Sequence, residues 1–74
     1  MYIQKIVTKG VGFKVGLKYL NKPIMKIDYA SNKDLVVHFE DNSVLKSEKV
    51  VNSEWNEDLL LIETSKKYWY FINK

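Results

Sequence analysis

Apolar residues alternate with glycine, lysine or polar residues along much of this chain, and this period of two restricts the fold more than any other feature. The pattern is clearest over residues 10–19, where every second residue is apolar and every residue between is glycine or lysine. Successive side chains of a strand point to opposite faces, so the alternation is typical of a strand with one buried face. A helix here would hold Gly12 and Gly16 internally, at a cost of about 1 kcal/mol each relative to alanine. We therefore predict a strand that ends at a turn over residues 21–23.

Shorter runs with similar alternation follow along the rest of the chain and are separated by turn residues. We expect strands at residues 2–7, 24–30, 35–40, 44–51, 59–63 and 68–72. Residues 52–58 are expected to form a polar loop or a single helical turn. This spacing predicts an all-β fold, a small antiparallel meander that forms a curved sheet or a barrel of the SH3 or OB kind. The alternative is an α+β fold with one short helix, at residues 14–20 or 53–61.

The alternation also predicts which side chains of each strand face the core. The expected inward residues are Leu35, Val37 and Phe39 in one strand and Met25, Ile27 and Tyr29 in another. His38 and Glu40 are then expected to face outward, as is Lys26.

The chain has 74 residues, and we expect one small β domain over residues 1–74. A domain of this size buries only about 60% of the surface that its unfolded chain exposes. Many such domains need a disulfide, a metal or self-association. Cysteine is absent, and one histidine cannot supply several imidazole ligands. We expect a homo-oligomer, with a well-packed monomer as the alternative.

The location of the protein is inferred from the segments that the sequence lacks. No run approaches the ~20 apolar residues of a membrane span, and the first residues lack the apolar core of a signal peptide. We expect a cytoplasmic protein without a membrane partner. Heavy use of lysine, asparagine, isoleucine and tyrosine indicates an AT-rich coding sequence, which we interpret as that of a low-GC bacterium or its phage.

The charges are segregated along the chain, and all 12 basic residues are lysines. Residues 1–27 hold six lysines and no acid, whereas residues 28–63 hold nine acids and three lysines; residues 64–74 add three lysines, for a net charge of +3. Such asymmetry indicates a charged partner. The alternative is ordinary surface charge that folding mixes again in space.

We predict that five lysines near the start of the chain form a partner-binding sheet face. They are Lys9, Lys14, Lys18, Lys22 and Lys26. The strands over residues 10–19 and 24–30 are expected to pair, which would create a flat surface of glycine and lysine. The three glycines lack the spacing of a dinucleotide-binding fingerprint or a phosphate loop, so we interpret them as bend residues.

Catalytic chemistry has little support in the sequence. His38 is the single imidazole, and Glu40 shares its predicted strand face. No cysteine is present, and no serine lies in a nucleophile-elbow motif. The acidic pairs lack the spacing of a calcium loop. We expect a protein that is not an enzyme and that binds no metal or cofactor.

Large apolar side chains occupy both faces of the last predicted strand. The predicted interface aromatic residues are Tyr68, Trp69, Tyr70 and Phe71 of this strand, together with Trp55. The strand is expected to be central and covered on both faces, to form a self-association interface, or to stack on bases. Trp55 is interpreted as a plug at the barrel end or as an exposed anchor for a partner.

Three functions fit this sequence. We favour a non-catalytic interaction module that binds an acidic protein surface through the lysine face, as a regulator or inhibitor of a host protein carried by a phage or mobile element. The alternative is a nucleic-acid-binding β-barrel with non-specific phosphate contacts, although the absence of arginine argues against sequence readout. The last is sequestration of a small anionic ligand such as a nucleotide.

Overall fold

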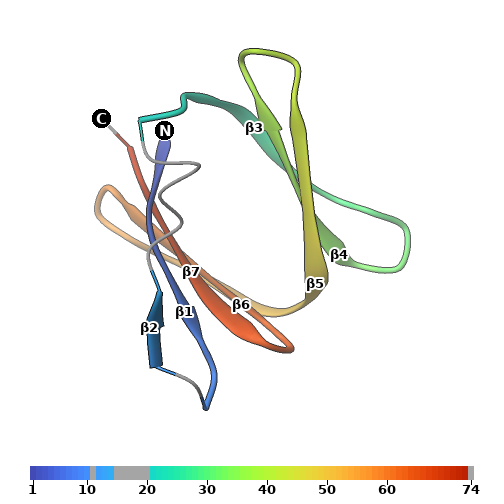
Figure 1. Cartoon of the computed structure of the whole chain (residues 1–74), viewed down its shortest axis with the longest axis vertical. Helices are drawn as coiled ribbons and strands as arrows, with labels where there is room; N and C mark the ends of the chain where they lie inside the picture. The colour runs from blue at the N-terminus through green and yellow to red at the C-terminus, as the bar shows by residue number, and fades with distance from the viewer. Residues whose placement is uncertain (11, 15–20, 74) are drawn as a thin grey trace.

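The computed structural model describes residues 1–10, 12–14 and 21–73, and these residues form seven strands and no helix (Figure 1). The strands are β1 (Tyr2–Thr8), β2 (Gly12–Lys14), β3 (Ile24–Tyr29), β4 (Asp34–Phe39), β5 (Val44–Asn56), β6 (Leu59–Thr64) and β7 (Lys67–Ile72). They form one sheet in the order β2-β1-β7-β6-β5-β4-β3. Every neighbouring pair is antiparallel. The predicted all-β meander is therefore confirmed.

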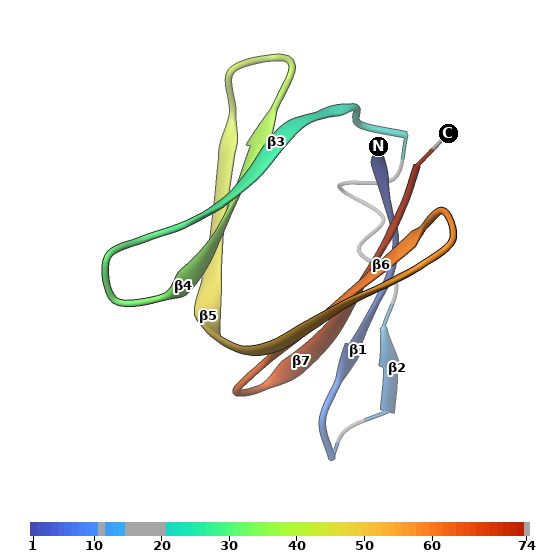
Figure 2. The same cartoon turned by 180° about the vertical axis from the view of Figure 1, so that it is seen from behind.

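The sheet curls into a half-barrel because β5 belongs to both of its halves (Figures 1 and 2). The first part of β5 pairs with β4, and the part from Val50 onward pairs with β6. The register shifts between Val50 and Asn52, so one extra residue is inserted at this point. Such a bulge bends a strand and increases its twist. At the opposite side of the curl, the Ile24 amide donates a hydrogen bond to the Met1 carbonyl at 2.9 Å.

The hydrophobic core lies between the two halves of the curled sheet. Its buried residues are Ile3, Ile6, Ile24, Leu35, Val37, Phe39, Leu60, Ile62, Trp69 and Phe71. The predicted inward positions in β4 are thus confirmed, with His38 half-buried and Glu40 exposed on the other side. Thr64 is a buried polar residue whose hydroxyl donates to the Lys67 carbonyl and accepts from the Lys67 amide, so its polar atom is satisfied.

Two local predictions are wrong because bulges and turns alter the alternation. The register of β3 shifts between Ile24 and Lys26, and Met25 is 57% exposed instead of facing the core. The segment 52–58 is not a loop or helical turn. β5 continues to Asn56 and turns back at residues 57–58, where Glu57 has a φ of 56°. The alternative helix at residues 53–61 is therefore excluded.

The predicted pairing of the first two lysine-bearing strands is also wrong. β2 pairs with β1 and β3 pairs with β4, so β2 and β3 lie at opposite edges of the sheet. The short connection after β1 explains this choice, and Gly10 there has a φ of 77°, a conformation that favours glycine. Residues 15–20, which belong to the predicted long strand and to the alternative helix, lie outside the described residues.

Within the described part of the chain, no helix is long and apolar enough to cross a membrane.

Candidate functional site: an apolar groove between two strand edges

The aromatic strand β7 lies between β1 and β6, which accounts for large side chains on both of its faces. Trp69 and Phe71 are buried in the core, with their rings stacked 6.2 Å apart. Tyr68 and Tyr70 are half-buried on the other face. The ammonium group of Lys9 lies 5.1 Å from the ring centre of Tyr68, and that of Lys5 lies 4.5 Å from the ring centre of Tyr70. Lysine side chains from the N-terminal part of the chain thus cover part of the outer aromatic row.

The five predicted lysines do not come together among the described residues. Lys9 forms an ion pair with Glu63 at 2.5 Å. Lys22 pairs with Asp41 at 3.1 Å and lies 4.6 Å above the ring of Phe39. Lys26 is exposed on β3. The backbone of Lys14 lies in β2, its side chain is outside the described part of the structure, and Lys18 is outside it altogether.

Asp41, the ion-pair partner of Lys22, is held by hydrogen bonds within the β4–β5 turn. The Ser43 hydroxyl donates to the Asp41 carboxylate at 2.6 Å, and the Ser43 amide donates to the same oxygen at 2.9 Å. These bonds, with a smaller contribution from Lys22, lower the pKa of Asp41 from 3.8 to about 2. Asn42, with a φ of 73°, completes this β4–β5 turn.

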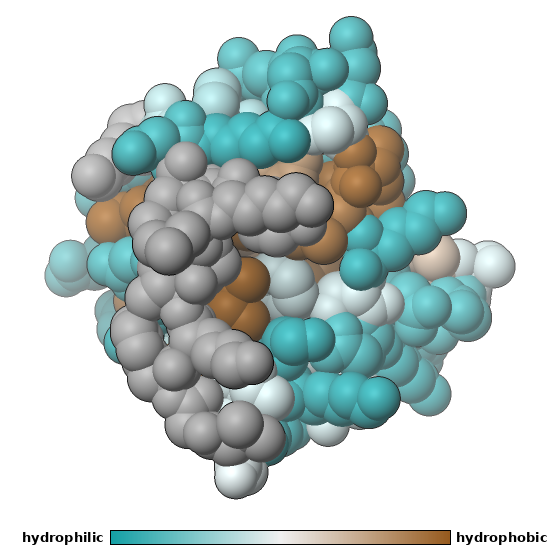
Figure 3. Space-filling view, viewed as in Figure 1, coloured by the Kyte–Doolittle hydropathy of each residue, from teal (hydrophilic) through white to brown (hydrophobic). Residues whose placement is uncertain are grey.

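Four of the five large exposed apolar side chains among the described residues gather at a different place. The five are Met25, Tyr29, Val44, Val51 and Trp55. All of them except Val44 line two adjoining cavities of about 350 and 310 Å³, which share Tyr29 and Ser53. We call these two cavities the groove. The space-filling view shows apolar surface in the hollow between the sheet halves, surrounded by hydrophilic side chains (Figure 3).

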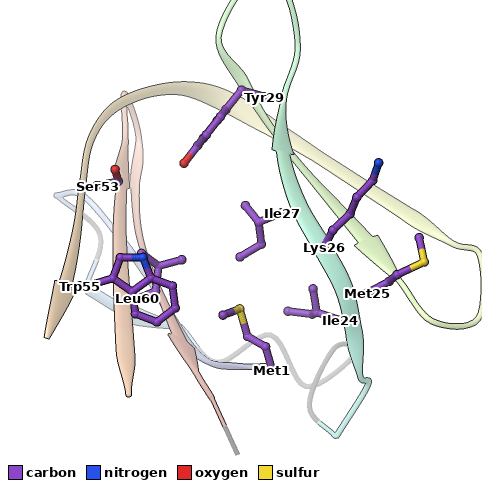
Figure 4. A pocket seen from close by; sticks show the side chains of 9 residues that line it. All are labelled: Met1, Ile24, Met25, Lys26, Ile27, Tyr29, Ser53, Trp55 and Leu60. Atoms are coloured by element: carbon purple, nitrogen blue, oxygen red, sulfur yellow. The ribbon is translucent and has the colours of Figure 1, made fainter. Parts of the chain in front are cut away.

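Strands from both halves of the sheet form the walls of the groove (Figure 4). Ile24 and Ile27 of β3 point into the cavity, and the Tyr29 side chain extends across it toward Ser53. Trp55 of β5 and Leu60 of β6 lie opposite. Leu60 and Trp55 are cross-strand partners, so they project from the same face of the sheet.

The groove forms where β5 bends away from the β3–β4 hairpin. The Val50 amide donates to the Lys33 carbonyl at 2.9 Å, and beyond this bond β5 pairs only with β6. β3 pairs only with β4, on its other side. Among the described residues, one edge of β3 and one edge of Val51–Asn56 are therefore without a strand partner.

The groove lining combines apolar side chains with neutral polar groups, and both of its charged side chains are positive. Lys26 and Lys33 are the charged residues of its lining, and Lys26 points away from the cavity at its rim. Glu54 of β5 pairs with Leu61 and is not part of the lining. The groove therefore offers apolar surface, the hydroxyl groups of Tyr29 and Ser53, the polar residue Asn52 and the lysines Lys26 and Lys33. In the described ranges, no three His, Asp or Glu side chains are grouped to hold a metal ion.

No protein family matches this chain, and neither a curated protein nor a solved structure matches it.

Sequence reasoning identified two residues of the groove, Lys26 and Trp55, as candidate site residues. Trp55 was predicted as a barrel plug or an exposed anchor, and with 58% of its surface exposed it does not close the barrel end as a plug would. Tyr29 was predicted to face the core and is 48% exposed in the groove wall. Ser53 and Val51 were missed. The signal that could have found Ser53 is its position two residues from Trp55, which places both on one face of an extended strand.

We expect the two tryptophans to differ strongly in their access to a quencher. Trp69→Phe leaves Trp55 as the reporter, and Trp55→Phe leaves Trp69, which is 3% exposed. Acrylamide should quench the emission of Trp55 efficiently and that of Trp69 weakly. Near-ultraviolet circular dichroism controls for loss of core packing in the Trp69→Phe variant. Equal quenching of the two folded variants would show that Trp55 is covered.

The contacts of Asp41 predict that Ser43 affects the pKa of Asp41 more than Lys22 does. Ser43→Ala should raise the pKa of Asp41 from about 2 toward 3.8, because the largest contribution is the Ser43 side-chain bond. Lys22→Ala should raise it less. A carboxyl group with a lowered pKa stabilises the fold above pH 3.8, and that contribution is lost as the pH falls toward 2. Carboxyl-carbon NMR titration measures the pKa, and a larger effect of Lys22→Ala would contradict this assignment.

Proposed function

We propose that this protein is a non-catalytic interaction module that binds an apolar segment of a partner protein in the groove between β3 and β5. The observation that supports this most strongly is the gathering of Met25, Tyr29, Val51 and Trp55 around one concave surface. Contiguous exposed apolar surface with a polar rim is typical of interaction sites. Burying one large apolar side chain contributes roughly 1.5–3 kcal/mol, so Trp55 and Tyr29 suffice to anchor a partner of moderate affinity.

The charge around the groove supports an acidic partner. Lys26 and Lys33 lie beside the apolar lining and are its two charged side chains. Complementary charge at the rim of an interface favours the right partner and speeds association. The proposal thus keeps the acidic partner predicted from the sequence, but places its binding site in the groove instead of on a lysine-rich sheet face. Lys9 and Lys22 contribute less in this proposal because each already pairs with a carboxylate of the same chain.

Nucleic-acid binding on the outer face of β7 is the second candidate. Tyr68 and Tyr70 are half-exposed there, with Lys5 and Lys9 over their rings, and aromatic rings beside cations can stack on bases. The ion pair of Lys9 with Glu63 places a carboxylate on the same face, where it would repel phosphate. We therefore rank this candidate below protein binding. Self-association, nucleotide binding and a role as a phage-borne inhibitor stay predictions from the sequence.

A selection from a displayed library of random linear peptides tests the proposed function. Wild-type protein should enrich peptides that combine large apolar with acidic residues, and Trp55→Ser or Tyr29→Ser should weaken binding of the enriched peptides by about tenfold or more. Both side chains are exposed, so the variants should fold normally, which far-ultraviolet circular dichroism verifies.

Val44→Ser is the matched control, because Val44 is 49% exposed but lies outside the groove. Its effect on peptide affinity should stay within about twofold. The proposal is wrong if no peptide is enriched, or if enriched peptides bind the Trp55 and Tyr29 variants as tightly as wild type. Failure of the peptide selection together with salt-sensitive binding of single-stranded oligonucleotides would favour the outer face of β7 instead.

A further inference from the structure

The side of the groove formed by β5 is a strand edge with open backbone groups. From Val51 to Asn56, β5 pairs with β6 on one side, and no described strand lies on the other. Adjacent residues of an antiparallel strand direct their amide and carbonyl groups to opposite sides, so about half of these groups point away from β6. A strand edge of this kind is a template for another extended chain.

The residues of this edge carry few of the features that block pairing. Natural edges are protected by charged side chains, lysine above all, by proline or by bulges. Val51–Asn56 contains neither lysine nor proline, and Glu54 is its single charged residue. The bulge between Val50 and Asn52 lies at the start of the edge, where β5 leaves β4. The five residues after it, Asn52 to Asn56, pair with β6 without a further shift of register, so this part of the edge is regular.

The side chains of the edge are also placed to contact those of an added strand. Ser53 and Trp55 pair with Ile62 and Leu60, which face the core, so they project toward the groove. A chain that pairs with this edge would place every second side chain on that same face. Those side chains would contact Trp55 on one side and Ile27 and Tyr29 of β3 on the other, because all of these residues line the groove.

We infer that the partner segment binds as an additional β-strand along Val51–Asn56, with alternate apolar side chains in the groove and acidic residues near Lys26 and Lys33. This inference rests on the proposed function and specifies its partner as an extended, acidic segment of another protein. Main-chain hydrogen bonds then supply part of the affinity and the groove selects the side chains, as in other cases of strand addition.

The dimensions of the groove favour a single segment over a second copy of this chain. The two cavities, of about 350 and 310 Å³, hold a short stretch of chain and not a folded sheet. β3 bounds the groove on its far side, so a second molecule cannot bring its own β5 alongside without also placing β6 there.

N-methylation of the peptide backbone tests this inference. A peptide enriched in the selection is synthesised with one N-methyl group at a time along its central residues, and the affinity of each form is measured. In an added strand, alternate amides bond to β5 and the others point away. We expect a loss of about tenfold or more at every second position and a change within about twofold between them. Each unaffected position is the matched control for its neighbours.

A scan without this alternation, in a peptide that still requires Trp55 and Tyr29, would overturn strand addition and leave the proposed function intact. Loss of peptide binding to the groove altogether would overturn both. Light scattering of the wild-type chain and of the two variants determines whether a second copy occupies the groove. A dimer that dissociates on Trp55→Ser but not on Val44→Ser would identify the occupant as a second copy and would contradict a partner segment.

Discussion

The bend in β5 is the constraint on which the rest of the structure depends. One extra residue between Val50 and Asn52 allows a single strand of 13 residues to serve both halves of the sheet. The bend brings the apolar faces of β4, β6 and β7 together around Phe39, Ile62 and Phe71. The same bend separates the end of β5 from β4 and β3 and leaves its edge open. Core and groove are thus two results of one backbone irregularity.

Polar side chains of β5, β6 and β7 form hydrogen bonds and ion pairs with one another at positions outside the groove. Thr64 satisfies its hydroxyl within the β6–β7 turn, and Lys67 pairs with Glu48 at 2.8 Å across the outer surface. Burial raises the pKa of Glu48, but hydrogen bonds from Lys67 and Ser47 more than offset this and the pKa is lowered. Most of the exposed large apolar surface is left at the groove, where its exposure costs stability and supplies binding energy.

Sequence patterns predicted the parts of the fold that depend on local alternation. The inward positions of β4 follow from a period of two, and the structure confirms Val37 as a core residue. For β7, a central position was one of three alternatives, and the structure shows this strand between β1 and β6. Bulges have no such signal, so the exposure of Met25 and the extension of β5 through Trp55 were missed. Alternation does not encode which strands pair, whether the partner is next in the chain, as for β1 with β2 and β3 with β4, or distant, as for β1 with β7. Alternation likewise does not show that Lys9 and Lys22, predicted to share one face, each pair with a carboxylate of a different strand or turn.

Amide hydrogen exchange in the free protein, measured residue by residue by NMR, tests the central claim most directly, because it requires no knowledge of the partner. The account predicts slow exchange at Ile62 and Trp69 in the central strands. Within Val51–Asn56 it predicts alternation, with slow exchange at amides that face β6 and fast exchange, close to that of an unstructured chain, at those that face the groove. Uniform protection along Val51–Asn56 would show that the edge is already paired, and would contradict an open groove that receives a partner strand.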